Sequence, residues 1–468
     1  MSILSVNAGS SSLKFALYPI EGDSLGDALL SGNIEGLEPA GVPRVSFAVQ
    51  GQKEAAPVNV LSQQEPFEAA LQSLKHLLQT RFEHIALKAV VHRVVHGGQF
   101  FSAGVVVTPD VFAQLSTLNA LAPLHQPHNL AGIRAFADAF PNLPQVACFD
   151  TAFHRTLSPL ETTFAIDHAL TQQGVRRYGF HGLSYQYVSQ RLQQHSPRAA
   201  GRVIMAHLGN GASLCATTQH QSRATTMGFS ALDGLMMGTR SGALDPGVLL
   251  YLMEQGWDHK RIQNMLYKQS GLLGVSGESA DMRTLRASSS LQAKFAIDLF
   301  THRVVREVGA LTACIGGLDV LAFTGGIGEH DVVLRAQVAQ ALPGAFLQEA
   351  VGHVEGRAPP AFDREELRQV RGIGRGHADH VDGPHPRRQQ RLVGVPERGV
   401  GDGQRRLRPQ RGGELLRSEL RQPLPALSPP RPGPPAGEDG GRHAGAGRGW
   451  ERGRRAGRRG AGVVFEIV

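Results

Sequence analysis

The chain has 468 residues, a net charge of +8 and three cysteines, so it is long enough for two or three domains with large cores. No apolar run approaches the ~18 residues of a membrane-spanning helix, and Lys14 interrupts the one early apolar run, so we expect neither a membrane span nor a signal peptide. The cysteines are widely spaced and form no CxxC pair, which predicts three small buried thiols in a reducing compartment and no zinc site.

The first predicted element is a β-hairpin with a polar turn. Ile3 to Asn7 and Leu13 to Pro19 are its strands, and Ala8-Gly9-Ser10-Ser11-Ser12 is the turn between them. Backbone N–H groups and hydroxyls in such a turn form a concave donor surface that suits phosphate, and Lys14 adds a point charge. The hairpin therefore predicts a phosphate-binding turn, with an ordinary Ser/Gly turn as the alternative.

Apolar strands then alternate with amphipathic helices as far as about residue 343. The runs that predict strands are Ala86–His92, Gln145–Phe149, Arg202–His207, Ser213–Thr217 and Leu318–Thr324. The runs that predict helices are Pro66–Thr80, Pro109–Leu121, Leu130–Phe140, Ser184–His195, Pro246–Gln255 and Leu291–Ile315. This alternation is typical of an α/β protein with mixed sheets that are covered on their faces.

A second Gly-rich turn, within His207 to Leu214, echoes the first hairpin. Each turn is entered from a predicted strand and left through Ser-Leu into another strand. The recurrence predicts a duplicated domain with a cleft between the two copies. Chance recurrence of a common turn type is the alternative.

The character of the sequence changes after about residue 345. Residues 364–468 contain 22 Arg, no Lys and 12 Asp or Glu, so the excess positive charge lies in this segment. It has too few apolar residues to fold alone, and we predict a disordered basic tail over 346–468. Arginine without lysine is typical of GC-rich DNA read out of frame, so we hypothesise a frameshift between about residues 340 and 370. A nucleic-acid-binding arm is the alternative, which is disfavoured because Trp450 is the one aromatic residue among the arginines.

Polar clusters occur at the ends of the predicted strands. They are Asn7–Lys14, Val91–Gly98, Ala122–Asn129, Cys148–His154, Arg177–Gly182, His207–Gly211, Gly238–Pro246, Ser279–Arg283 and Phe323–Glu329. Six of them coincide or overlap with the stretches VNAGSSSLKF, RVVHGG, FDTAFH, YGFHG, HLGNGAS and FTGGIGE. This ordered set resembles the acetate kinase family, part of the acetate and sugar kinase/Hsp70/actin superfamily, over residues 1–340. Propionate kinases share most of these motifs.

The resemblance implies an α/β fold with two actin-like ATPase domains of the duplicated ribonuclease-H-like type, residues 1–150 and 151–345. ATP and acetate would meet in the cleft between them, and direct in-line transfer would give acetyl phosphate and ADP reversibly. It also implies Mg²⁺, with Mn²⁺ as an alternative metal, and a cytoplasmic homodimer. Propionate remains an alternative acceptor, because one methylene changes binding by only ~1–3 kcal/mol.

The resemblance assigns roles to five polar residues. Arg93 would bind the carboxylate, with His125 beside it, and Arg240 would stabilise the transferring phosphoryl group, since a guanidinium matches carboxylate and phosphoryl oxygens. His181 would stabilise the transition state. Asp150 would act as acid or base, or orient Arg93 or the metal. The alternatives are salt bridges for the arginines and a helix N-cap for Asp150.

The residues that the resemblance assigns to ATP surround the Gly-rich turns and two later motifs. They are Ser12, Lys14, His207, Leu208, Gly209, Asn210, Gly211, Asp281, Met282, Arg283, Gly326, Ile327, Gly328, Glu329 and His330. His330 departs from the family's usual Asn. The chain has no GxxxxGK[ST] motif, which excludes a P-loop enzyme, and Gly326-Ile327-Gly328 lacks the third glycine of a dinucleotide fingerprint.

Apolar residues beside the motifs are expected to line the acetate pocket, namely Val95, Leu124 and Phe180. His96 and His154 are expected to pack behind the site.

The metal site is the point at which the chain departs from the family. Asn7 is the expected Mg²⁺ neighbour, but the C-terminal Pro-Thr-Asp-Glu-Glu motif is missing, and Glu365-Glu366 lacks the apolar strand before it. A catalytically defective family member is therefore an alternative.

Overall fold

The computed structural model describes residues 1–342, apart from 10, 23, 39–40, 58–64 and 124, and two later strands, Glu349–His353 and Val464–Ile467. These strands belong with residues 1–342 to one compact unit, Met1–Ala378 with Arg459–Val468. Within the described part of the chain, no helix combines the length and the apolar character needed to cross a bilayer.

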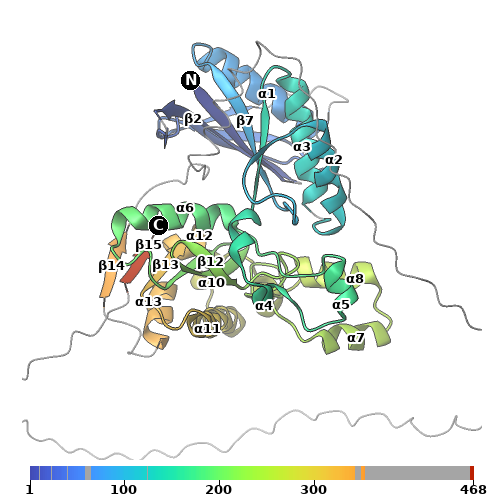
Figure 1. Ribbon diagram of the computed structural model, residues 1–468, viewed down its shortest axis with the longest axis vertical. Helices are drawn as coiled ribbons and strands as arrows, with labels where there is room; N and C mark the ends of the chain where they lie inside the picture. Colours follow the sequence, from blue (N-terminus) through green and yellow to red (C-terminus); the bar gives the residue numbers. More distant parts are fainter. Residues whose placement is uncertain are drawn as a thin grey trace, which may run out of the picture. The chain divides into compact units, whose positions relative to one another are not determined.

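The first sheet has the strand order β6-β5-β4-β2-β1-β7-β9-β8, with β3 paired to β2 (Figure 1). Its strands are β1 Ser2–Ala8, β2 Ser12–Glu21, β3 Ser24–Leu25, β4 Leu30–Glu35, β5 Arg44–Val49, β6 Gln52–Pro57, β7 Leu87–Val94, β8 Val105–Val106 and β9 Gln145–Phe149. The accompanying helices are α1 Pro66–Arg81, α2 Pro109–Ser116, the 3₁₀ turn η1 Thr117–Ala120 and α3 Gln126–Ala139. Leu74 of α1 and Phe136 of α3 pack in one buried cluster with Leu4 and Val6 of β1, so helices cover this face of the sheet.

The second sheet has the order β12-β11-β10-β13-β15-β14. Its strands are β10 Val203–Leu208, β11 Ala212–Thr218, β12 Gln221–Thr225, β13 Val320–Thr324, β14 Glu349–His353 and β15 Val464–Ile467. The helices after β9 are η2 Ala152–Thr156, α4 Pro159–Thr162, α5 His168–Gln172, α6 Gly182–His195, α7 Pro246–Glu254, α8 His259–Lys268, α9 Gly271–Ser276, α10 Met282–Ala287, α11 Leu291–Cys314, α12 Gly325–His330 and α13 Val332–Ala341.

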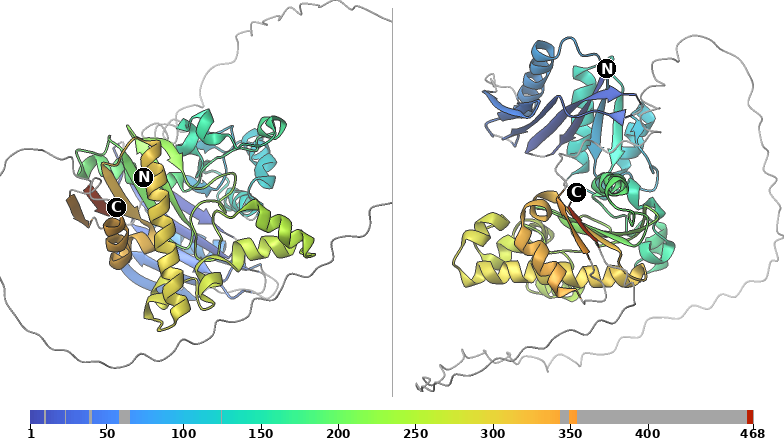
Figure 2. Two further views of the ribbon diagram at one scale, coloured as in Figure 1. Left: turned by 90° about the horizontal axis from the view of Figure 1, so that it is seen from below. Right: turned by 90° about the vertical axis from the view of Figure 1, so that its left-hand side faces the viewer.

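Helices α11 and α6 pack against the second sheet through different sets of buried residues (Figure 2). Phe300 and Val304 of α11 pack against Ile204 of β10, whereas Val188 of α6 packs against Met205 of the same strand. Since successive strand residues point to opposite faces, the two helices cover opposite faces of the sheet.

The two sheets repeat one pairing pattern. In the first, β1 is antiparallel to β2 and parallel to β7; in the second, β10 is antiparallel to β11 and parallel to β13. The predicted duplication of an α/β unit is confirmed. The division of the chain at about residue 150 stays a prediction.

The predicted elements agree with the structure except at a few ends. The helix predicted from Leu130 begins at Gln126, because Pro127 occupies the first turn, where a missing N–H costs nothing. The helix predicted over Pro109–Leu121 is divided into α2 and η1.

The prediction of a disordered tail over 346–468 is wrong for two segments, which form strands β14 and β15 by pairing in the second sheet. Strand β15 pairs in parallel with β13 on one side, from Val320 opposite Val464 to Phe323 opposite Ile467, and with β14 on the other. The remaining tail, with Glu365, Glu366 and most of the hypothesised frameshift region, lies outside the described residues.

Two of the three cysteines have the predicted burial. Cys148 and Cys215 are buried, and burial raises the pKa of Cys215 to about 12. The prediction is wrong for Cys314, which is exposed at the last position of α11, where the buried face of the helix ends with Leu311 and Thr312.

Candidate active site

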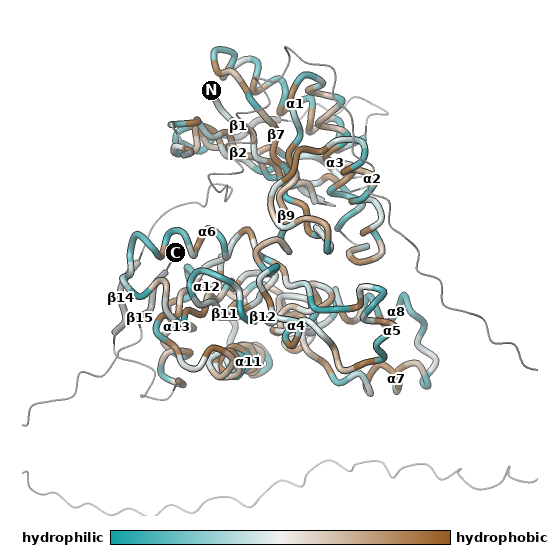
Figure 3. The backbone as a smooth tube through the Cα atoms, in the orientation of Figure 1, coloured by the Kyte–Doolittle hydropathy of each residue, from teal (hydrophilic) through white to brown (hydrophobic). Residues whose placement is uncertain are grey.

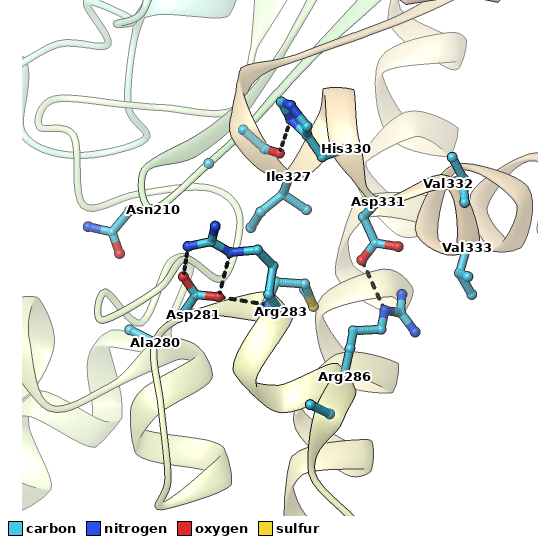
Figure 4. Close-up of a pocket in the computed structure, with 14 residues that line it drawn as sticks. Asn210, Ala280, Asp281, Arg283, Arg286, Ile327, His330, Asp331, Val332 and Val333 are labelled. Atoms are coloured by element: carbon cyan, nitrogen blue, oxygen red, sulfur yellow. Dashed lines mark hydrogen bonds and ion pairs between the residues drawn. The ribbon is translucent and has the colours of Figure 1, made fainter. Parts of the chain in front are cut away.

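A hollow of about 980 Å³ lies beside the second sheet, between the β10–β11 turn, α10 and the region where α12 meets α13 (Figure 4). It is lined by Gly209, Asn210, Ala280, Asp281, Met282, Arg283, Arg286, Ala287, Gly326, Ile327, His330, Asp331, Val332 and Val333. A volume of this size, with apolar walls and a few polar groups, suits a nucleotide-sized ligand.

Side-chain hydrogen bonds fix the walls of this hollow. Asp281 caps α10 by accepting from the backbone N–H of Arg283 (2.8 Å) and of Thr284 (3.3 Å). The Arg283 guanidinium also donates to the Asp281 carboxylate (2.7 Å), and this hydrogen bond lowers the pKa of Asp281 to about 2. Arg286 of α10 donates to Asp331 (3.0 Å), which caps α13, so the two walls are joined.

The backbone of the GGIGE turn, residues 325–329, lines part of the hollow. Gly325 has a φ of +79°, and a Cβ there would lie 2.8 Å from the Leu208 carbonyl oxygen, so only glycine fits. Glu329 folds back and accepts from the Gly325 N–H (3.1 Å). A Cβ on Gly326 would meet nothing within 4 Å, so this backbone is open to a ligand.

Eight of the residues predicted to bind ATP line the hollow together: Gly209, Asn210, Asp281, Met282, Arg283, Gly326, Ile327 and His330. Those that do not line it are Ser12, Lys14, His207, Leu208, Gly211, Gly328 and Glu329. Sequence reasoning missed Ala280, Arg286, Ala287, Asp331, Val332 and Val333. Arg286 comes one helical turn after Met282, and that spacing would have placed it on the same face of α10.

Lys14 lies apart from this hollow. Its exposed side chain is on β2, opposite Asn7, and lines a separate hollow of about 570 Å³ with residues of β4, β5 and β6. The turn before it is closed by a hydrogen bond from the Gly9 N–H to the Ser12 carbonyl (2.9 Å), and Ser10 lies outside the described residues.

We expect Asp281→Ala to weaken ATP binding more than it slows turnover at saturating ATP. The substitution removes the α10 cap and frees Arg283, so the free energy of unfolding should fall by about 1 kcal/mol, and the KM for ATP should rise several-fold. Steady-state kinetics and thermal denaturation measure the two effects. Asp258→Ala is the matched control, because Asp258 caps α8 outside the hollow (2.7 Å to the Arg261 N–H); an equal rise in KM there would contradict the prediction.

Arg93 and Asp150 form a two-pronged ion pair at the ends of neighbouring parallel strands. The guanidinium Nε donates to one carboxylate oxygen (3.0 Å) and an NH₂ group to the other (2.6 Å). The Asp150 side chain is 3% exposed and that of Arg93 is 37% exposed, so the cation faces open space while the carboxylate holds it from behind. Asp150 is not the helix cap that was considered, since Thr151 occupies the N-cap of η2 and makes no side-chain cap.

His181 lies close to this ion pair in a strained backbone conformation. It is the N-cap of α6, with a φ of +61°. The next residue, Gly182, donates its N–H to the Asp150 carbonyl (2.8 Å), and a Cβ there would meet that carbonyl, so the two segments are in close contact. The His181 ring lies 4.3 Å from that of His207.

Both histidines are neutral at pH 7. Burial lowers the pKa of His207 to about 4, with the charge of Arg93 adding to it. Burial also lowers the pKa of His181 well below 6.5, and the nearby charges of His207, Arg93 and Arg240 lower it further. Each ring therefore offers one N–H donor and one acceptor.

Arg240 lies near His181, beside the β10–β11 turn of the second sheet. Its guanidinium donates to the Ala231 carbonyl (2.7 Å), and another of its nitrogens lies 3.5 Å from the point where a Cβ on Gly211 would stand. His181 Nε2 lies 3.4 Å from that same point. Gly209 and Asn210, in the same turn, line the large hollow, so the turn joins the hollow to this cluster of polar groups.

His125 completes the cluster. Burial lowers its pKa to about 4, and the positive charges of Arg240 and Arg93 lower it further, while Asp150 opposes them. These interactions bring together all five polar residues that the sequence singled out for catalysis and carboxylate binding.

A small apolar hollow of about 20 Å³ adjoins the cluster. It is lined by Val95, Leu121, Ala122, Pro123, His125, Phe180, Ser230, Ala231 and Tyr267. Val95 and Phe180 were predicted here, Tyr267 was not, and Leu124 lies outside the described residues.

The two remaining histidines are buried behind the cluster, as predicted. His96 accepts from the Gly98 N–H through Nδ1 (2.9 Å). His154 donates from Nε2 to the Phe180 carbonyl (2.9 Å) and so holds the segment that carries His181.

Known proteins share this architecture and these motifs. The acetokinase family profile matches residues 2–348. The chain belongs to the acetokinase family. Acetate kinase from Rhodopseudomonas palustris CGA009 is 51% identical over 343 residues, covering 72% of this chain and 85% of that protein. Acetate kinase from Methylocella silvestris is 45% identical, covering 73% and 86%.

Solved structures of the family have the same fold. The propionate kinase of Francisella tularensis matches with a TM-score of 0.68 at 39% identity, covering 73% of this chain and 87% of that one. The acetate kinase of Porphyromonas gingivalis matches with a TM-score of 0.65 at 37% identity, covering 72% and 86%. The ribonuclease-H-like, actin-like fold predicted for the acetokinase family is therefore confirmed for this chain.

The sequence predicts Asn7 as a neighbour of Mg²⁺ at this site. Among the described residues, no group of three His, Cys, Asp or Glu side chains is placed to hold a metal ion. Asn7 and Asp150 offer the amide and carboxylate oxygens that suit a hard cation. A divalent ion that keeps several waters and binds chiefly nucleotide phosphates fits such a sparse set.

Proposed function

We propose that the chain catalyses reversible phosphoryl transfer from ATP to acetate, giving acetyl phosphate and ADP. One observation carries this proposal: the Gly209–Gly211 turn lines the large hollow with Gly209 and Asn210, and His181 and Arg240 face its last residue, Gly211. A nucleotide in that hollow can thus present its terminal phosphate to a cluster of cationic and neutral donors.

The reaction needs positioning and charge neutralisation more than proton transfer. Acetate is already an anion at pH 7, because carboxylic acids titrate near ~4, so no general base is required. Arg93, oriented by Asp150, binds the carboxylate. One acetate oxygen attacks the γ-phosphorus, the bond from that phosphorus to the oxygen of ADP breaks, and Arg240 and His181 bind the oxygens on which charge accumulates.

Mg²⁺ belongs to the proposal, with Asn7 and Asp150 as the protein oxygens that would hold it. When bound, the ion would neutralise phosphate charge. The chain's own residues supply the remaining donors.

A hydroxamate assay on the purified full-length protein tests the function. Acetate with MgATP should give acetyl phosphate, trapped as the hydroxamate, with one ADP formed for each. ATP binding without any product would instead support the catalytically defective alternative, and salt-sensitive nucleic-acid binding lost on truncation after residue 363 would support a basic arm.

We expect acetate to be preferred to propionate by about 10- to 100-fold in kcat/KM, since the hollow of about 20 Å³ lined by Val95 and His125 has little room beyond a methyl group. Val95→Ala should narrow this preference by admitting the extra methylene, and the same assay with both acids measures it. Val338→Ala, a buried valine of α13 outside the site, is the control. Equal kcat/KM for the two acids in the unaltered protein would favour the propionate kinase alternative.

A cytoplasmic homodimer is the proposed form of the enzyme. Helix α7 supports this, because none of its residues is buried and Leu250 and Met253 are 63% and 55% exposed. Much of α7 has hydrophobic colouring in Figure 3. An apolar helix face of this kind is typical of a protein–protein interface. The free, widely spaced cysteines agree with a reducing compartment.

We expect Leu250→Glu to convert the dimer to a monomer, because a charge in an apolar interface is not paired. Light scattering after size exclusion measures the mass. Leu291→Glu, at an 80% exposed leucine of α11, should leave the mass unchanged. A monomeric unaltered protein would remove the proposed dimer.

A further inference from the structure

Two serine hydroxyls hold the paired histidines from the side away from the proposed phosphoryl site. Ser213 Oγ lies 2.8 Å from His181 Nδ1, and Ser184 Oγ lies 2.9 Å from His207 Nδ1. The bonds cross between α6 and the β10–β11 hairpin, since each element supplies one serine. Both rings are thus bonded through Nδ1, which leaves both Nε2 atoms for other partners.

A third hydroxyl continues the chain of hydrogen bonds behind His181. Tyr185 Oη lies 2.5 Å from Ser213 Oγ, and both residues are fully buried. The Tyr185 ring itself packs with Val188, Leu192 and Met205, so a phenyl ring would keep that packing without the hydroxyl.

The direction of the protons along this chain follows from the bonding of Tyr185. Burial raises the pKa of Tyr185 well above 10, so the phenol keeps its proton. Among the described residues, Ser213 Oγ is the one side-chain hydrogen-bond partner of this buried phenol. The phenol proton therefore requires an acceptor, which is Ser213 Oγ.

Ser213 must then direct its own single proton to His181. Because that hydroxyl donates to Nδ1, the neutral imidazole carries its proton on Nε2. Nε2 is the atom that lies near Gly211 and Arg240, at the side where the proposed phosphoryl group would be bound. If these hydrogen bonds ran in the opposite direction, the buried phenol proton would have no acceptor, at a cost comparable to a lost hydrogen bond.

We propose that Tyr185 and Ser213 are positioning residues that hold His181 as its Nε2–H tautomer, aimed as a neutral donor at the transferring phosphoryl group. Only the identity of that group rests on the proposed function. The tautomer itself is a property of the protein without substrate.

Nitrogen-15 NMR of the full-length protein with labelled histidine tests the tautomer directly. The His181 signals are assigned by their loss in His181→Asn. We expect Nδ1 to be unprotonated and Nε2 protonated in the unaltered protein, and a mixture of tautomers in Ser213→Ala. An unaltered protein with the proton on Nδ1, or a Ser213→Ala spectrum like that of the unaltered protein, would overturn the proposal.

Kinetics test the consequence for turnover. Ser213→Ala should lower kcat about tenfold and Tyr185→Phe about threefold, as expected for lost hydrogen bonds, with the KM values for acetate and ATP within twofold. Thr312→Val, which removes a buried hydroxyl bonded to the Val308 carbonyl of α11, is the matched control and should leave kcat unchanged. Unchanged kcat in both Ser213→Ala and Tyr185→Phe would overturn the proposal. A fall in kcat without a change in the His181 tautomer would also overturn it.

The NMR and kinetic experiments together distinguish failure of the Tyr185–Ser213–His181 hydrogen-bond chain from failure of the proposed function. The unaltered protein could form no acetyl phosphate and still carry the His181 proton on Nε2, with that preference lost in Ser213→Ala. In that case the hydrogen-bond chain is supported and the proposed function fails.

Discussion

Arg240→Ala should lower kcat by about 10³-fold while changing the dissociation constant for ATP by no more than threefold. An arginine that binds charge only as it develops on the transferring group contributes to the transition state and little to the ground state. The structure favours this separation, because Arg240 lies near His181 and Gly211 and does not line the large hollow. Hydroxamate kinetics give kcat, and calorimetry gives the dissociation constant.

Arg306→Ala is the control for this loss of charge. Arg306 makes an exposed ion pair with Glu307 on α11, and such pairs contribute little. Its kcat should equal that of the unaltered protein. If Arg240→Ala kept normal turnover, Arg240 would have no place in the site.

Arg93→Ala should raise the KM for acetate by about 100-fold, since it removes the cation proposed to bind the carboxylate. It should also lower the free energy of unfolding, because Asp150 becomes a buried carboxylate without its partner. We expect about 1–2 kcal/mol, less than for a fully buried pair, because Arg93 is 37% exposed and water screens the interaction.

The double variant Arg93→Ala/Asp150→Ala separates the two effects. Removing the carboxylate as well should restore stability, because no buried charge is left unpaired, whereas acetate binding should stay weak. Chemical denaturation and steady-state kinetics measure the two quantities. Recovery of acetate binding in the double variant would show that Arg93 acts through Asp150 alone.

Much of the fold could be predicted because the core strands are continuous apolar runs. Val320–Thr324 and Gln145–Phe149 are buried at every position, and such runs are recognisable without any partner. Strands β4 and β5 were missed because polar residues such as Asn33 and Ser46 interrupt them. Their pairing with β2 depends on contacts distant in sequence.

The site was predictable in so far as its residues stand in motifs. Arg93, Asp150 and His181 come together because strand ends and one Gly-flanked turn meet. Tyr267 and Tyr185 were missed, since a tyrosine on a helix has no distinctive local pattern, and Ser213 of the HLGNGAS motif was given no role. Their roles arise only from what the fold places beside them.

Strand β15 places residues that are distant in sequence inside the second sheet. It lies between β13 and β14, so β13 would become an open edge and β14 would lose the strand it pairs with if Val464–Ile467 were absent. An unpaired edge presents free N–H and C=O groups to any passing strand. Loss of Val464–Ile467 would therefore put this protein at risk of self-association through the exposed edge of β13.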